Sequence, residues 1–451
     1  MLDKILIIIY NLIILVLPYD LKLSFFTYPK ILFIYSLVIL IYLICRKKLN
    51  IKELLKDKTF KNLTIGYLVF FIIISISTIT NFIVDKKFVL SNFFEILRII
   101  EYYLIFINYY ILINKDTKKS FNISLIFLIL LSILISFFQF HNLFNLNELY
   151  IRFVAPTQYE TLINGYKWPR AVALAGNPNV LGFLMTLASI YVLYLLIKNY
   201  KKWYLYIIYA LIIICVFLTA SRTSYISLIL GNGILIFLTF FKLKKECIIK
   251  MFLVGFIFLV FHIVLILALP NSYTWRIKTI IDYKNETSWQ KRLDMNEEFL
   301  DEIKNEHDDN RNNNEIDNIE ENKSEQDDYN VTNNIEENQD TGKTTSKKSV
   351  FSLIIGHGPD KYKNKHKGYF DNEWLMIFFH YGFFGVIAYL FMTIYPLCSI
   401  KENKIFNYSL YIAVIVANYI YMITASSFNS YLLFGFVSIL MSISMNRHIK
   451  E

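Results

Sequence analysis

Four arginines are the residues of this chain best suited to chemistry on an anionic substrate: Arg170, Arg222, Arg276 and Arg292. A guanidinium offers a planar fork of donors that fits phosphate oxygens, and it keeps its charge at cellular pH. An arginine at bilayer depth costs at least about 2.5 kcal/mol unless it is paired or hydrated. These arginines either converge on an anionic ligand or extend toward lipid headgroups. For Arg222, which lies in a short polar turn between long apolar runs, we favour the ligand.

A second charged group lies within one apolar run, where Glu95, Arg98 and Glu101 are spaced at i, i+3 and i+6. That spacing places the three side chains near one helix face, where neighbours can pair. Charged residues inside a membrane usually face a bundle interior or a wet cavity. The group is either part of a substrate site, with Arg98 as a binding residue, or a self-neutralising contact that fixes its helix to a neighbour.

Candidates for proton transfer lie just before another apolar run. Asp371 precedes Asn372 there, and a carboxylate at that position could accept a proton from a substrate hydroxyl. The alternative for this pair is a helix cap. His357 and His366 are further exposed candidates, and as a base His366 ranks behind Asp371. Because the histidines are scattered and no Cys-x-x-Cys pair occurs, we expect neither a metal nor a cofactor.

Apolar runs must position these residues, since 55% of the chain is hydrophobic and only 18% is charged. Runs of about 20 residues are long enough to cross a bilayer as helices. We predict an all-α polytopic membrane protein with about twelve transmembrane helices. The expected spans are Ile5–Leu17, Ile31–Ile44, Leu63–Val84, Phe93–Ile113, Phe121–Phe140, Gly176–Ile197, Tyr204–Leu218, Thr223–Phe241, Ile248–Leu269, Trp374–Leu397, Ile405–Thr424 and Tyr431–Met445.

The net charge of +10 is carried by short lysine and arginine clusters between the apolar runs, as in cytoplasmic loops. The strongest cluster follows the second expected span and begins with Arg46-Lys47-Lys48. Alternation of the spans from this cluster predicts a multi-pass protein of the cytoplasmic membrane with both termini in the cytoplasm. The same clustering argues against nucleic acid as a partner.

The predicted organisation has three parts. Residues 1–269 contain the first nine spans, residues 270–373 form a large extracytoplasmic loop between spans 9 and 10, and residues 374–451 contain the last three spans. A shorter outer loop is expected from His141 to Ala175. Within the large loop, residues 301–346 are rich in Asn, Asp and Glu and too poor in apolar side chains to offset the entropy of ordering. We expect this insert to be disordered and dispensable.

Four patches resemble, in their order along the chain, the O-antigen ligase/polymerase superfamily of integral membrane enzymes. They are Arg170-Ala171 with Gly176-Asn177-Pro178-Asn179, the turn from Leu218 to Ser224 with Arg222, the segment from Trp289 to Leu293 with Arg292, and Gly356-His357-Gly358 followed by Asp371-Asn372-Glu373-Trp374-Leu375 and Tyr381-Gly382-Phe383-Phe384-Gly385. No single patch is specific to the family. Their order, and their expected placement on one side of the membrane, carries the resemblance.

The resemblance implies an enzyme that takes a glycan from undecaprenyl diphosphate and joins it to an acceptor sugar hydroxyl at the outer face of the membrane. It implies Arg222 and Arg292 as catalytic arginines that hold the diphosphate, with Arg170, Asn179 and His366 as substrate-binding residues. Asp371 stands where the ligase branch has a histidine, which favours a polymerase of repeat units with Asp371 as a catalytic base. A flippase and a chain-length regulator are the further partners expected.

Two other functions stay open. A ligase of the same superfamily would pass finished glycan to a lipid, wall or protein acceptor. A flippase or transporter of lipid-linked sugars would show internal repeats and charges along a central path. The sequence shows no convincing repeat and its arginines are expected on one face, which favours an enzyme.

Overall fold

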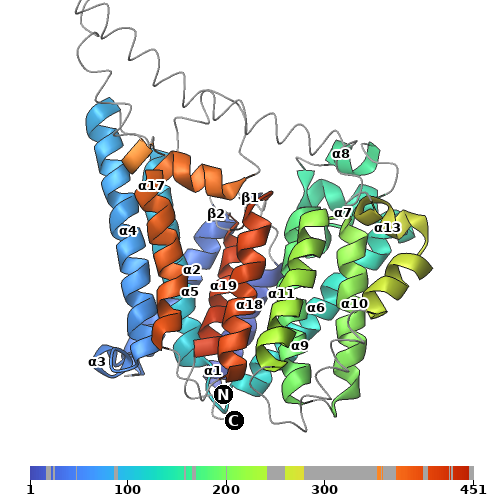
Figure 1. Ribbon diagram of the computed structural model, residues 1–451, viewed down its shortest axis with the longest axis horizontal. Helices are drawn as coiled ribbons and strands as arrows, with labels where there is room; N and C mark the ends of the chain where they lie inside the picture. The colour runs from blue at the N-terminus through green and yellow to red at the C-terminus, as the bar shows by residue number, and fades with distance from the viewer. Residues whose placement is uncertain are drawn as a thin grey trace, which may run out of the picture.

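The computed structural model describes residues 1–16, 22–23, 26–46, 48–85, 90–156, 159–164, 169–199, 201–240, 260–278, 353–356, 358, 372–399, 405–425, 427 and 430–445. In these residues the chain is helical, apart from a two-residue antiparallel ladder of β1 (Lys22–Leu23) with β2 (Phe26–Thr27). The long helices run side by side in one bundle (Figure 1). The predicted all-α fold is confirmed at this level.

Eleven long helices build the bundle in the described part of the chain. They are α1 (Leu2–Val16), α2 (Tyr28–Cys45), α4 (Lys58–Asp85), α5 (Leu90–Leu112), α6 (Lys118–Phe140), α9 (Pro178–Lys198), α10 (Trp203–Thr219), α11 (Arg222–Phe240), α17 (Glu373–Ile394), α18 (Ile405–Met422) and α19 (Tyr431–Met445). Short elements join them: α3 (Ile51–Leu54), η1 (Leu143–Asn145), α7 (Leu146–Val154), α8 (Tyr159–Asn164), η3 (Ala173–Ala175), α13 (Asn271–Lys278) and η5 (Tyr395–Ser399). The predicted outer loop from His141 to Ala175 therefore contains two helices, α7 and α8.

Six helical segments among the described residues are long and apolar enough to cross a membrane: α2, most of α4, α6, α9, α11, and α17 with η5. They indicate a helical membrane protein. Helices α10 and α19 are apolar but shorter, and α1, α5 and α18 also lie at expected spans. The ninth expected span lies mostly outside the described residues, as does the large loop. The count of twelve spans stays a prediction.

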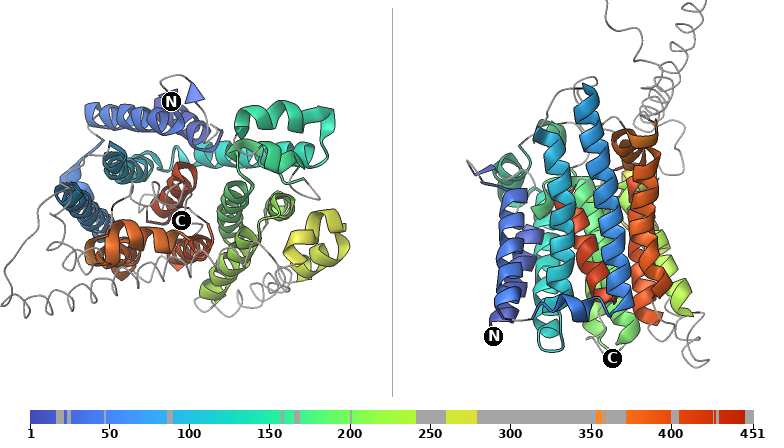
Figure 2. Two further views of the ribbon diagram at one scale, coloured as in Figure 1. Left: turned by 90° about the horizontal axis from the view of Figure 1, so that it is seen from above. Right: turned by 90° about the vertical axis from the view of Figure 1, so that its left-hand side faces the viewer.

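Helices α9 and α19 form the centre of the bundle. Every residue of α19 is buried, and α9 is buried without interruption from Leu181 to Leu196. Helix α9 packs against α10, α11 and α18, while α19 packs against α5 and α18. The view from above in Figure 2 places α19 (red) inside the ring of other long helices. Helices that are apolar on every side are stable in such a position because neighbours cover all of their surface.

The two ends of the bundle differ in what they carry. Helix α1 begins and α19 ends at one end, which we call the terminal end (Figure 1). The connections from α2 to α4, from α5 to α6 and from α9 to α10 return at this end, with Arg46, Lys48, Lys115 and Lys201 among their residues. Helices α5, α9, α11 and α17 begin at the other end, which we call the far end.

Helix α17 is not the straight span expected from the sequence. Gly382 has φ +67° and ψ −167°, which breaks the helix. In Figure 1 the first part of α17 lies across the far end and the rest descends through the bundle. The break leaves the carbonyl of His380 to accept from Ser77 Oγ (3.1 Å) and from the backbone N–H of Gly358 (3.1 Å). A Cβ on Gly382 would lie 2.3 Å from the carbonyl oxygen of Ile354, so the contact requires glycine.

Candidate functional site

Arg170 is the centre of a buried hydrogen-bond network at the far end. Its Nε donates to the carbonyl oxygen of Thr219 (2.9 Å), and a terminal nitrogen donates to Oδ1 of Asn179 (2.9 Å). The neighbouring N–H of Ala171 donates to the carbonyl of Leu218 (3.0 Å). These bonds fix the segment before α9 to the last turn of α10, whose final carbonyls have no partner within their own helix.

A tight turn delivers Asn179 to Arg170. Gly176 adopts the left-handed conformation, with φ +73°. Asn177 then caps α9, because its side chain accepts from the N–H groups of the next two non-proline residues at 2.8 and 3.3 Å. Pro178, at the first helical position, has no N–H that needs a partner. The Asn177 cap leaves the Asn179 side chain to accept from Arg170.

Arg222 is the first residue of α11 and follows a very short turn. Ala220 ends α10 in the left-handed conformation, with φ +50°. Ser221 Oγ lies 2.8 Å from Ser224 Oγ, which closes the turn onto the helix. The Arg222 side chain is half-buried. A helix N-terminus carries unpaired N–H groups and a partial positive charge that attract anions, and Arg222 adds a full charge there.

The starts of α9 and α11 are in direct contact. Ser224 Oγ donates to the carbonyl of Asn179 (3.3 Å). Gly182 permits this approach, since a Cβ there would lie only 2.7 Å from Ser224 Oγ. Three predicted site residues, Arg170, Asn179 and Arg222, therefore belong to one pair of joined turns.

Two residues that the sequence did not single out hold the Arg170 segment from another side. Gln139 Oε1 accepts from the N–H groups of Val172 (3.0 Å) and Ala173 (2.7 Å). Tyr150 Oη donates to the carbonyl of Ala173 (2.9 Å), and burial raises the pKa of this phenol, which therefore keeps its proton. Gln139 could have been found from the sequence, because a lone amide at the end of an apolar run indicates a polar contact. Tyr150 lies in a stretch that was expected to be a loop.

Arg98 belongs to a second polar group, in which acidic side chains accompany it. It pairs with Glu95 at 2.7 Å, and its guanidinium lies 5.2 Å from the centre of the Tyr431 ring. Tyr381 Oη donates to the same Glu95 carboxylate (3.3 Å). Glu101, further along α5, is buried as well. Arg98 is neutralised by Glu95 on its own helix. Tyr431 and Tyr381 bring α19 and α17 to the pair, which favours a contact between helices over a phosphate site.

The connection between α18 and α19 contacts both the start of α11 and a further buried acid at the start of α17. Thr424 is hydrogen-bonded to Thr223, the residue after Arg222. Ser427 donates from its N–H (2.6 Å) and its Oγ (3.1 Å) to the carboxylate of Glu373, which is fully buried. This connection thus holds the start of α17 and the start of α11, although the sequence marked Glu373 only as part of a patch.

Three predicted site residues lie outside the described residues: Arg292, Asp371 and His366. The neighbouring Asn372 is described and caps α17, accepting from the N–H groups of Trp374 (3.1 Å) and Leu375 (3.3 Å). The cap predicted at Asp371-Asn372 is therefore confirmed for Asn372.

Among the described residues, no group of three or more His, Cys, Asp or Glu side chains is placed to hold a metal ion. Comparisons of the chain with family models, with curated proteins and with solved structures gave no match. The resemblance to the O-antigen ligase/polymerase superfamily therefore rests on the four sequence patches alone.

Proposed function

We propose that this protein is a glycosyltransferase that polymerises oligosaccharide repeat units carried on undecaprenyl diphosphate, in O-antigen, capsule or exopolysaccharide synthesis. The observation that carries the proposal is the placement of Arg170, Asn179 and Arg222 on two joined turns at one end of a bundle of apolar helices. The phosphates of a lipid-linked diphosphate lie between the apolar lipid chain and water, which corresponds to the end of the helix bundle.

In the proposed reaction, Arg222 and Arg292 hold the diphosphate of the donor. The bond from sugar C1 to the diphosphate oxygen breaks, and a bond from C1 to the acceptor hydroxyl oxygen forms. Negative charge grows on the departing diphosphate, and guanidinium groups stabilise it in the transition state. The proton of the acceptor hydroxyl passes to the carboxylate of Asp371, and His366 contributes to substrate binding.

Arg170 and Arg98 receive supporting roles. Arg170 already donates to Thr219 and Asn179, so it positions the two turns that present Arg222. Arg98 pairs with Glu95 and lies against Tyr431, so it holds α5 to α19. We assign direct contact with the phosphates to Arg222 ahead of both.

The proposed orientation puts the far end outside the cell. Basic residues of short connections gather at the terminal end, and such residues are retained in the cytoplasm. Both chain ends are then cytoplasmic. A flippase would deliver the lipid-linked repeat unit to the far end, where a chain-length regulator would also act.

The test compares lipid-linked and surface glycans in a deletion strain that carries the chain or its variants. Arg222→Ala should leave single repeat units on the lipid and lower polymer synthesis by about 10²–10³-fold, as for loss of one transition-state donor. Arg222→Lys should retain part of the activity, because the charge stays but the planar fork is lost. Arg46→Ala, an exposed arginine at the terminal end, is the matched control and should leave the polymer unchanged.

Polymer of normal length and amount from Arg222→Ala, at a normal protein level, would contradict the proposal. Long chains that accumulate without attachment in the deletion strain would identify a ligase instead of a polymerase.

A further inference from the structure

Helix α7 has three different faces. Its buried face consists of Asn147, Ile151 and Val154. Glu148 and Arg152 form an exposed polar face. Leu149 and Phe153 form a third face, and these large apolar side chains are 64% and 81% exposed. At four positions apart they lie roughly 40° from each other around the helix axis, so they form one continuous stripe.

Phe144, just before α7, extends this apolar stripe and is 85% exposed. It has φ +59°, and Asn142 and Asn145 beside it are also left-handed. Asparagine tolerates this conformation, but an aromatic residue adopts it only with backbone strain. Removing the phenylalanine side chain from water is favourable, and this gain offsets the backbone strain.

The stripe continues a lipid-facing surface of α6. Phe127, Leu134 and Phe137 are exposed along α6, which is one of the six helices able to cross a membrane. At the end of α6 the Phe138 ring lies 6.2 Å from the Phe144 ring. Side chains that meet acyl chains along α6 thus lead directly to the exposed apolar stripe of α7, at the level where the membrane span ends.

We propose that α7 lies in the surface of the bilayer, with Phe144, Leu149 and Phe153 inserted among the lipids and its polar face turned to water and headgroups. Helices of this kind bury their apolar face about 5–10 Å into the boundary between headgroups and acyl chains. The partner of this surface is the lipid bilayer, which the continuity with α6 favours over a second copy of the chain. The proposal does not depend on the reaction proposed above.

The buried side of α7 connects the lipid surface to the candidate site. Tyr150 is bonded to the carbonyl of Ala173, and the carbonyl of Val154 lies against Gly176 in the turn before α9. The position of α7 in the bilayer therefore fixes the depth at which Arg170 and the start of α9 meet the headgroups.

The test is site-directed spin labelling of the full chain in nanodiscs of phosphatidylethanolamine and phosphatidylglycerol, with the native cysteines replaced by serine. Labels are placed by Leu149→Cys and Phe153→Cys. Phe127→Cys on α6 is the lipid reference, and Glu148→Cys, on the polar face of the same helix, is the matched control. Collisions with oxygen, which dissolves in acyl chains, should exceed collisions with a water-soluble nickel chelate at the first three positions and fall below them at Glu148.

A preference for the nickel chelate at Leu149 and Phe153, equal to that at Glu148, would overturn the proposal, because the stripe would then lie in water. Dipolar broadening between labels on two chains would also overturn it, because a second copy would then cover the stripe.

Discussion

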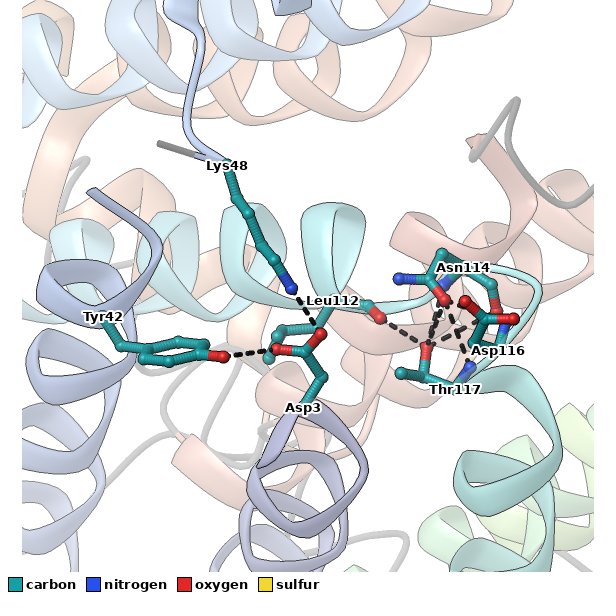
Figure 3. A network of polar contacts seen from close by, with 7 residues as sticks. All are labelled: Asp3, Tyr42, Lys48, Leu112, Asn114, Asp116 and Thr117. Carbon is teal, nitrogen blue, oxygen red and sulfur yellow. Dashed lines mark hydrogen bonds and ion pairs between the residues drawn. The ribbon is translucent and has the colours of Figure 1, made fainter. Parts of the chain in front are cut away.

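The two ends of the bundle hold their polar side chains in different surroundings. Figure 3 shows a network at the terminal end, where Asp3 contacts Lys48 and accepts from Tyr42 (2.8 Å). The side chains of Lys48 and Asp3 are 38% and 21% exposed. At the far end, by contrast, Arg170 is only 6% exposed and Glu373 is fully buried.

Charged side chains at the terminal end stay partly in water. At the far end they are buried, and burial of a charge costs free energy. The turn before α6, also drawn in Figure 3, satisfies its groups locally, with the N–H groups of Asp116 and Thr117 donating to Asn114 Oδ1 at 2.9 and 3.2 Å. Such contacts near water change the free energy of unfolding only slightly. Buried charges need partners that replace water, so at the far end the loss of one side chain leaves a buried partner unpaired.

The largest effect on stability is expected at the far end, from Arg98→Leu. The substitution leaves the buried Glu95 carboxylate without its ion-pair partner, and breaking such a pair costs about 3–5 kcal/mol in the free energy of unfolding. Denaturation in detergent micelles measures the loss. Arg98→Leu/Glu95→Leu should recover most of it, because the Glu95 carboxylate is then no longer left without its partner. A double variant as unstable as the single one would show that Arg98 acts through other contacts.

A smaller loss is expected at the break in α17. Gly382→Ala forces an alanine into φ +67°, ψ −167°, a region that costs about 1–3 kcal/mol and is essentially limited to glycine. The added Cβ also meets the backbone of Ile354. Gly233→Ala, on α11 with open space around it, is the matched control and should be neutral or slightly stabilising. Equal thermal stability of the two variants would mean that the break is not needed.

The sequence predicts what local signals determine. Long apolar runs locate the helices, and Asn-Pro at the entry to α9 locates its cap, because both depend on neighbouring residues. The spacing of Glu95 and Arg98 likewise predicts that the two can pair on α5.

What the sequence could not predict depends on distant segments. Gly382 belongs to a patch that carries the family resemblance, but its role as a helix break depends on the segment at Ile354 that packs against it. Tyr381 donates to Glu95, which is 286 positions away in the sequence, and no local pattern predicts such a contact. Helices α7 and α8 were missed because they are too short to show a long apolar run.

The smallest effect is expected at the terminal end, from Lys48→Ala. Its contact with Asp3 is partly exposed, so the substitution should lower the free energy of unfolding by no more than about 1 kcal/mol. Tyr42 still donates to Asp3 after the change, and added salt should shrink the difference further because it screens charges near water. Denaturation of both proteins at low and high salt measures this. A loss that matched Arg98→Leu and resisted salt would mean that the terminal end depends on charge as strongly as the far end, and the contrast between the ends would then have no energetic basis.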